Sequence, residues 1–417
     1  MKIEKAALLS ALLVAGKITS KGDMFPILSC VYLDGARGFL AATDLETTVV
    51  TQLDVRGAVD EDVFCVLHKP FTEIVKSVDA EDIEITFDPS AGKIDVNGIF
   101  KDVHTWPVED FPEIPLGSVD TSTDINATVH TAALKAVLKA IPKTDDNGYG
   151  LGKIRFDADT GLIVGTNGHR LHTAKAVISK MSWNLPKEAV DAILAAAEKE
   201  EEIRFYGDGL FESYPVPDDY LDGLKKPQLL SLADDYFGQA FSPKATIAEI
   251  KAELMKAIAE KSREEYEAMR MVAVFEKTKV FVHLEKSMFP DYTAVLPKSY
   301  ANTLLITRGD VKTALRQAKV MLNKDFRAAR LSFNGGIDIT VRNSDLGVFQ
   351  KANIPVRKGK VDPSVEVAFN LPYLMDALAT APSDDEEIRV CLSSDPVKNP
   401  LVFEHGDLQA LVMPVRI

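Results

Sequence analysis

The residues best suited to acid–base chemistry are few, and His169 is the most prominent of them. It lies in the stretch TNGHRL, between two apolar runs that are typical of strands. Nucleophilic catalysis would need a nucleophile beside this histidine and a third group to orient it. The sequence has no GxSxG, no P-loop and no HExxH motif. Cys30, Cys65 and Cys391 are too far apart for a metal-ligand motif. We therefore expect no enzymatic activity, no cofactor and no metal.

Basic residues at helical spacing are the second feature with chemical meaning. Lys135 and Lys139 are four residues apart, as are Lys312 and Arg316, so each pair shares one face of a predicted helix. Three predicted helical segments carry net charges of +2, +3 and +3, although the whole chain carries -14: residues 2–17, 132–143 and 308–319. One interpretation is lysine scattered by chance over surface helices. The other is a basic inner surface that attracts phosphates without reading sequence.

The elements that must position these residues form a threefold internal repeat. Each copy has an Xaa-Pro helix start, an apolar helix, an acidic turn and an alternating strand. The copies run from His68 to Asp88, from Asn184 to Asp208, and from Asn370 to Leu392. Ile83, Ile203 and Ile388 are the equivalent apolar residues of the three strands. A repeat of this length indicates repeated domains rather than a short-period solenoid.

A second shared stretch precedes each copy, and one of the basic helices precedes that stretch. The shared stretches begin at Gly38, Gly161 and Gly336, and each predicts a strand, a polar turn and another strand. The spacing of the repeat is wider in the middle copy, which indicates an insertion at about residues 212–271. We predict three domains: domain 1 (1–122), domain 2 (123–298) and domain 3 (299–417).

Composition agrees with a soluble, cytoplasmic protein of several domains. The chain has 417 residues, of which 46% are hydrophobic and 26% charged. No apolar run is long enough for a membrane span. The apolar N-terminus could be a signal peptide, but Glu4 and the lack of a clear cleavage site favour an amphipathic helix. The scattered cysteines favour a reducing compartment.

Six motifs on this threefold repeat resemble the bacterial DNA polymerase III beta subunit family, the DNA sliding clamps. The likeness covers nearly the whole chain apart from the insertion. In chain order, the motifs are MFPILSCVYLD with AATDLETTV, TWPVEDFPEIP, VGTNGHRL, MFPDYTAVLPK, FNLPYLMDAL and LVMPVRI. The resemblance implies an α+β fold of three repeated clamp domains, each with two helices on antiparallel sheets. It further implies a head-to-tail homodimer that forms a six-domain ring around duplex DNA, without sequence specificity.

The resemblance also implies a pocket between domains 2 and 3 that binds short QLxLF-like tails. Replicative polymerase, clamp loader and repair proteins would dock there. Apolar walls would take the leucine and phenylalanine of the tail, while a few polar groups would orient it. Carried over by motif, the pocket residues are Leu151, Thr166, Gly168, His169, Arg170, Leu171, Pro290, Val295, Asn370, Tyr373, Val412, Met413, Pro414 and Val415. The sequence departs from the family at Ala294, where a basic residue is usual, and at Asn167, where aspartate is usual.

The remaining carried-over residues concern DNA and the subunit interface. Lys21 and Tyr149 match positions that touch DNA in the family, in addition to Lys135, Lys139, Lys312 and Arg316. The resemblance places Phe111 on the domain 1 side of the subunit interface, and Val320 and Met321 on the domain 3 side. The alternative for these three apolar residues is an ordinary place in a core. Exposed apolar residues at both ends would favour head-to-tail closure.

The insertion has no counterpart in the family pattern. Residues 224–260 predict two helices joined by an extended piece, broken at Ser242-Pro243. Leu229, Leu232 and Ala233 form one apolar face, and Ile247, Ile250, Leu254 and Ile258 form the other. The stretch resembles helix-extension-helix modules of the LEM or Rho-N-terminal type, which bind nucleic acid or protein. A surface hairpin without a partner fits equally well.

Two functions of different classes follow from the sequence. The first is a processivity factor that encircles DNA and holds a polymerase there. The second is a clamp-like protein that binds peptides without encircling DNA, for instance a phage-encoded decoy. The oligomeric mass separates the two.

Overall fold

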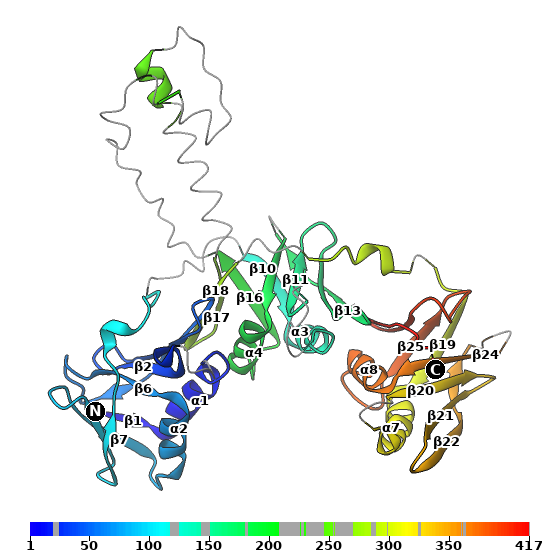
Figure 1. Cartoon of the computed structure of the whole chain (residues 1–417), viewed down its shortest axis with the longest axis horizontal. Helices are drawn as coiled ribbons and strands as arrows, with labels where there is room; N and C mark the ends of the chain where they lie inside the picture. The colour runs from blue at the N-terminus through cyan, green and yellow to red at the C-terminus, as the bar shows by residue number, and fades with distance from the viewer. Residues whose placement is uncertain are drawn as a thin grey trace.

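The computed structural model shows three blocks of sheet and helix arranged in an arc (Figure 1). Helices lie along the concave side of the arc and strands along its convex side (Figure 1). The antiparallel sheets and the two helices of each block confirm the predicted α+β class with three repeated domains. The structure describes residues 1–19, 25–116, 125–142, 151–179, 182–207, 226, 229–230, 246–252, 254, 270–284, 289–297, 299–323, 327–359, 361 and 364–416.

The helices of the three domains that the structure describes face the inside of the arc (Figure 1). They are α1 (Lys5–Ala15), α2 (His68–Ser77), α3 (Thr131–Leu138), α4 (Lys187–Ala196), α7 (Arg308–Ala318) and α8 (Leu371–Ala377). The short 3-10 helix η4 (Lys319–Met321) continues α7. Proline lies in the first turn of α2 and α8 and directly before α4, where its fixed φ suits a helix start.

The strands of the described residues form four antiparallel sheets, two with nine strands and two smaller ones at the ends of the arc. The end sheet of domain 1 has the order β5 (Val55–Arg56), β1 (Lys2–Glu4), β7 (Asp82–Asp88), β8 (Lys93–Val96) and β9 (Phe100–His104). The end sheet of domain 3 has the order β22 (Gly347–Ile354), β21 (Ile337–Asn343), β20 (Ala328–Phe333) and β24 (Val365–Asn370).

The two nine-stranded sheets are continuous across the domain boundaries. The first has the order β14 (Val177–Ile178), β10 (Ile125–His130), β16 (Glu202–Gly207), β17 (Arg270–Val274), β18 (Thr278–His283), β4 (Thr47–Gln52), β3 (Phe39–Thr43), β2 (Cys30–Asp34) and β6 (Val63–Leu67). The second has the order β15 (Trp183–Pro186), β11 (Lys153–Asp157), β12 (Leu162–Thr166), β13 (Arg170–Lys175), β27 (Leu408–Val412), β26 (Leu401–His405), β25 (Glu387–Leu392), β19 (Asn302–Thr307) and β23 (Val356–Lys358). Domains 1 and 2 therefore join through β4 and β18, and domains 2 and 3 through β13 and β27.

One backbone hydrogen bond recurs in all three domains and ties the first helix to the strand after the second. In each domain the amide of the first helical residue donates to the carbonyl oxygen of a glutamate that directly precedes a strand. The pairs and their N···O distances are Lys5 and Glu81 (2.8 Å), Thr131 and Glu201 (2.8 Å), and Arg308 and Glu386 (2.9 Å). The predicted equivalents Ile83, Ile203 and Ile388 are all buried in the strands that follow. The sequence repeat is therefore a repeat of structure.

Two details differ from the sequence-based expectations. The helix expected from residue 2 begins at Lys5, because residues 2–4 form β1 between β5 and β7. The insertion ends earlier than expected, because Arg270 and Met271 already belong to β17. Within the insertion, residues 247–252 are helical and Ile250 is buried. Much of its predicted second helix, and Leu232, Ala233 and Ile258, lie outside the described residues.

Apolar side chains hold the helices against the sheets in two large clusters. One cluster spans domains 1 and 2, and includes Leu8 of α1 and Ile193 of α4. The other lies within domain 3 and includes Leu315 of α7 and Leu374 of α8. In the described part of the chain, no helix has both the length and the apolar character needed to cross a membrane.

Candidate functional site

The loop between β12 and β13 forms the domain 2 side of the candidate pocket. The Thr166 hydroxyl donates to the Arg170 carbonyl oxygen over 2.7 Å and accepts from the Gly168 amide over 3.1 Å. The Asn167 Oδ1 accepts from the His169 amide over 3.0 Å and from the Arg170 amide over 3.1 Å. Gly168 has a φ of 81°, which glycine adopts without steric cost. These hydrogen bonds fix the loop that carries His169.

The same loop is built a second time in domain 1, between β3 and β4. The Thr43 hydroxyl donates to the Thr47 carbonyl oxygen over 3.1 Å and accepts from the Leu45 amide over 3.1 Å. The Asp44 Oδ1 accepts from the Glu46 amide over 3.1 Å and from the Thr47 amide over 2.6 Å. Leu45 has a φ of 81°, as Gly168 does. The TD and TN pairs in the shared sequence stretches are the signal for this loop.

Helix α8 provides the domain 3 side, and three contacts join it to the loop of domain 2. The Asn167 Nδ2 donates to the Tyr373 hydroxyl over 3.1 Å. The Arg170 guanidinium carbon lies 4.4 Å from the centroid of the Tyr373 ring. Arg170 also forms an ion pair with Asp376, one turn along α8. Asp376 was not among the residues predicted from the sequence, since its acidic side chain falls within an ordinary helical pattern.

The C-terminal segment crosses from domain 3 onto the same loop. The Met413 amide donates to the His169 carbonyl oxygen over 3.0 Å, and the Val415 amide donates to the Ala368 carbonyl oxygen over 2.8 Å. Asn370 caps α8, because its Oδ1 accepts from the Tyr373 amide over 3.3 Å. The loop, the helix start and the C-terminal segment therefore meet at one place.

The predicted pocket residues range from buried to exposed. The buried ones are Thr166, Leu171 and Val412; the half-buried ones are Leu151, Arg170, Asn370, Tyr373, Met413 and Pro414; the exposed ones are Gly168, His169, Pro290, Val295 and Val415. Leu171 packs in a cluster with Tyr292 and Leu411, and Phe289 and Leu296 pack against that cluster. The segment that contains Pro290 and Val295 therefore flanks the same side of the sheet as Leu171. Ala294 is exposed on this segment.

The basic residues of the inner helices fall into two groups. Lys135 on α3, Lys139 directly after α3, and Arg316 on α7 are exposed. Lys312 is instead held by Asp384, with its Nζ 2.7 Å and 2.9 Å from the two carboxylate oxygens. The hydrogen bond from Lys312 lowers the pKa of the Asp384 carboxyl.

The first residues of α1 and α7, Lys5 and Arg308, are basic, and both bind neighbouring groups of the protein. The Lys5 Nζ donates to the Lys76 carbonyl oxygen over 3.1 Å and to the Val78 carbonyl oxygen over 2.5 Å, at the end of α2. Arg308 pairs with Asp384. The basic charge available on α1 and α7 is therefore smaller than the sequence indicates. Lys21 and Tyr149, the other predicted DNA contacts, lie outside the described residues.

The three predicted interface residues differ in exposure. Val320 is 74% exposed at the end of domain 3, and Met321 beside it is half-buried. Phe111 is only 8% exposed; it packs with Cys30 and Cys65, and its ring centroid lies 5.4 Å from that of Tyr32. Phe111 thus has the core environment that the sequence left open as the alternative, and it is not an exposed apolar residue.

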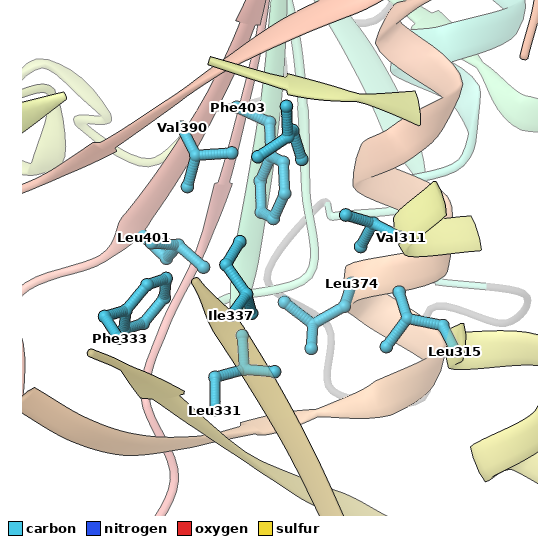
Figure 2. Close-up of a pocket in the computed structure, with 10 residues that line it drawn as sticks. Val311, Leu315, Leu331, Phe333, Ile337, Leu374, Val390, Leu401 and Phe403 are labelled. Carbon is cyan, nitrogen blue, oxygen red and sulfur yellow. The ribbon is translucent and has the colours of Figure 1, made fainter. Parts of the chain in front are cut away.

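Elsewhere in the described structure, the hollows include two that contain no predicted pocket residue. Figure 2 shows apolar side chains of domain 3, among them Val311, Leu374 and Phe403, pointing toward one another. The space between them is about 10 Å³, which is at the lower limit for one water molecule. The second hollow, of about 580 Å³, is lined by mostly charged residues of the turn after α4 and of β16 and β17.

Comparison with known proteins gives one consistent family. The DNA polymerase III beta subunit models match at both ends, the N-terminal domain over residues 1–115 and the C-terminal domain over residues 293–416. The Vibrio cholerae beta sliding clamp is 23% identical over 100% of this chain and 99% of its own length. That of Haemophilus influenzae is 21% identical over 97% and 96%.

Solved structures show the same fold over the full length. The Thermotoga maritima DNA polymerase III beta subunit has a TM-score of 0.71 at 17% identity, and covers 100% of this chain and 99% of its own. The Helicobacter pylori beta clamp, solved with a bound DNA ligase peptide, has a TM-score of 0.69 at 17% identity and covers 100% of both chains.

Proposed function

This chain belongs to the DNA polymerase III beta subunit family, and we propose that it acts as a sliding clamp by closing into a ring with a second copy of itself. The observation that carries this proposal is the pair of incomplete sheets at the ends of the arc. Sheets that cross a domain boundary have nine strands, whereas the end sheets have five and four. A five-stranded end and a four-stranded end from two copies would together make another nine-stranded sheet.

The order of the strands predicts which sheet edges of the two copies would meet. In the end sheet of domain 1, β9 has the position that β18 has in domain 2 and β27 has in domain 3. In domain 3, β22 has the position of β4 and β13. Because β18 pairs with β4 and β27 pairs with β13, we expect β9 of one copy to pair with β22 of the other. A head-to-tail contact of this kind forms a ring when its rotation closes.

The existing junctions also predict the register of the proposed one. The paired residues at the start of β4 and β13 are Thr47 opposite Val282, and Arg170 opposite Val412. Gly347 has the same position at the start of β22, since it pairs with Asn343 across the hairpin. Val103 corresponds to Val282, because Phe87 and Gly207 each lie four residues after the equivalent isoleucine. Phe87 pairs with Ile94, which pairs with Val103, and Gly207 pairs with Met271, which pairs with Val282. Val412 has the same place in domain 3, opposite Leu401 of β26. We therefore expect Val103 to lie opposite Gly347 of the second copy.

Exposed apolar side chains at the two ends support this contact. Val320, Leu346 and Val348 of domain 3 are 74%, 63% and 59% exposed; Leu346 directly precedes β22, and Val348 is the second residue of that strand. Ile99, directly before β9 in domain 1, is 69% exposed. Burying such residues against a second copy would remove apolar surface from water.

We propose that duplex DNA occupies the space inside the ring. The exposed lysines Lys135 and Lys139 and the exposed Arg316 lie on inner helices or directly after one and would attract phosphates. Contacts to phosphates carry no sequence information, so the ring would bind DNA without sequence preference and could move along it. The role is non-catalytic, and we expect it to be carried out in the cytoplasm.

We propose that the site where the β12–β13 loop, α8 and the C-terminal segment meet binds QLxLF-like tails of the replicative polymerase, the clamp loader and repair proteins. Leu171 and Met413 offer apolar and adaptable surface, and Asn370 and Tyr373 offer polar groups. The DNA ligase peptide in the Helicobacter pylori clamp supports a peptide-binding role for this fold.

The decisive experiment is the oligomeric mass with a cross-link. At micromolar concentration we expect light scattering to give twice the chain mass of 45.7 kDa. The pair of substitutions His104→Cys and Leu346→Cys should then form two disulfides per ring under oxidising conditions. These positions lie one residue along the same register, as Met413 and His169 do at the existing junction, and they leave Gly347, whose φ is 100°, unchanged. Facing positions in neighbouring strands have a Cα separation that a disulfide can span. The native cysteines Cys30, Cys65 and Cys391 are buried, so the parent chain is the control.

A monomeric mass over the whole concentration range would overturn the ring and favour a clamp-like protein that binds tails without encircling DNA. A dimer that fails to cross-link, although a pair shifted by two residues does so, would overturn only the register.

A further inference from the structure

We infer that Asp376 is a positioning residue of the peptide pocket, which acts by holding Arg170 against Tyr373. The inference rests on the proposed function, because it concerns how the two walls of the proposed pocket are kept together. Asp376 itself is not among the residues that would touch the peptide. Its effect on binding would pass through the two residues beside it.

The Arg170 side chain is already occupied by the protein. It is only 10% exposed, its Nε donates to the Ala140 carbonyl oxygen over 3.3 Å, and its Nη1 donates to Asp376. Its guanidinium also lies over the Tyr373 ring. A guanidinium held in this way is not free to bind a carboxylate of a partner. The Arg170 side chain, which comes from β13, therefore links the segment after α3 to α8.

Asp376 is the anionic partner of Arg170 in this link. It lies three residues after Tyr373 on α8, so the two side chains share a face of the helix. Without Asp376, the cation–π contact would lack the anion that fixes the guanidinium. Tyr373 would then be held from domain 2 mainly by the hydrogen bond from Asn167. We expect the ring of Tyr373 to lose its fixed position relative to the loop of domain 2.

The chain provides a matched comparison at the other end of β13. Lys175 and Asp407 form a second ion pair between domains 2 and 3, with Nζ 2.8 Å from Oδ1. Their side chains are 72% and 66% exposed, and Asp407 belongs to the β26–β27 turn, away from the pocket loop. Removing Asp407 deletes an ion pair between the same two domains without disturbing Tyr373.

The experiment compares peptide affinity among the full-length chain, Asp376→Asn, Asp376→Glu and Asp407→Asn. The probe is a fluorescently labelled QLxLF-type peptide, and its dissociation constant is measured by fluorescence anisotropy at one ionic strength. We expect Asp376→Asn to weaken binding about fivefold, the size of effect found when a residue acts through its neighbours. Asp376→Glu should restore most of the affinity, because it restores the carboxylate. Asp407→Asn should change it by less than about twofold, as expected for an exposed pair.

Each outcome bears on one of the two proposals. If the unchanged protein does not bind the peptide, the proposed pocket is wrong. If it binds and Asp376→Asn binds equally well, the positioning role is wrong. The role is also wrong if Asp407→Asn loses as much affinity, or if Asp376→Glu recovers none of it while its thermal unfolding midpoint matches that of the unchanged protein.

Discussion

The Met413 amide donates to the His169 carbonyl oxygen, and an equivalent bond joins the other pair of domains. There the His283 amide donates to the Glu46 carbonyl oxygen over 2.7 Å, compared with 3.0 Å at Met413. The loops that accept these bonds are themselves built alike, so the two domain boundaries are variants of one junction. They differ in the helix that faces the loop. The third residue of α8 is Tyr373, whereas the third residue of α4 is the buried Ala189.

Deleting residues Met413 to Ile417 should abolish binding of a QLxLF-type peptide. The deletion removes the C-terminal wall of the pocket and its bond to His169, while β27 ends at Val412 and stays paired with β13. Fluorescence anisotropy measures the affinity, and circular dichroism checks that the fold is kept. A shorter deletion of Arg416 and Ile417 is the control and should bind nearly as the full chain does. Unchanged affinity after the longer deletion would show that the pocket lies elsewhere.

Replacing Lys135, Lys139 and Arg316 by alanine should make retention on circular duplex DNA less dependent on salt. The slope of log affinity against log salt should fall by roughly one unit for each phosphate that the protein no longer neutralises. Lys312→Ala should have a smaller effect, because Asp384 already occupies its Nζ. Retention is measured over a range of salt concentrations.

Alanine at Lys93 and Lys175 is the control for that loss of charge. Both lysines lie on strands and pair with acids, Asp102 and Asp407 respectively. Their removal should leave the slope nearly unchanged. A slope that responds equally to both sets would contradict a basic inner surface.

The repeated framework could be predicted because it depends on local patterns. Proline at the helix starts and isoleucine at Ile83, Ile203 and Ile388 produce the same helix and strand in each domain. The recurring Thr-Asx pair of the pocket loop is also present in the shared stretches that begin at Gly38 and Gly161. The structural meaning of that pair appears only once its hydrogen bonds are known.

The charges of the inner surface could not be predicted in the same way. Lys5 and Lys312 look alike in the sequence to Lys135, yet their partners come from Val78 and Asp384, more than 70 residues away. Whether a lysine faces solvent depends on such long-range partners. Phe111 shows the same limit for apolar residues, since residue type alone does not distinguish a core from an interface.

Replacing Leu45 by glycine should stabilise the protein. Leu45 has a φ of 81°, a conformation that costs a residue with a β-carbon about 1–2 kcal/mol, and its side chain is 61% exposed. Part of this gain is offset by the larger backbone entropy of glycine in the unfolded chain. The net increase in the free energy of unfolding should be about 0.5–1 kcal/mol, measured by urea denaturation.

Gly168→Leu is the reciprocal change in the equivalent loop and should destabilise the protein. If Leu45→Gly were instead destabilising, the leucine side chain would have to make a contact that outweighs the strain of its backbone.

Asp44→Asn should stabilise the protein at high pH and much less at low pH. Burial raises the pKa of Asp44 to about 6, against the opposing effect of the hydrogen bond from the Thr47 amide. The folded chain therefore holds a proton on Asp44 that the unfolded chain has released, and stability falls as pH rises from about 4 to about 6. Asparagine removes this penalty and can accept the same amides, as Asn167 does in the equivalent loop. We expect a gain of roughly 1–2 kcal/mol at about pH 8, measured by urea denaturation.

Asp88→Asn provides a control with the opposite sign. Asp88 forms the same kind of turn on the surface, where its Oδ1 accepts from the Ser90 amide over 2.9 Å and from the Ala91 amide over 3.1 Å. The hydrogen bond from the Ser90 side chain, with those amides, lowers the pKa of Asp88. Its contribution to stability is therefore present above the unfolded pKa and is lost as pH falls through the folded pKa. Asp88→Asn should destabilise at neutral pH and do so less in acid. A gain from Asp44→Asn that is the same at every pH would contradict the raised pKa, because asparagine would then be acting through packing alone.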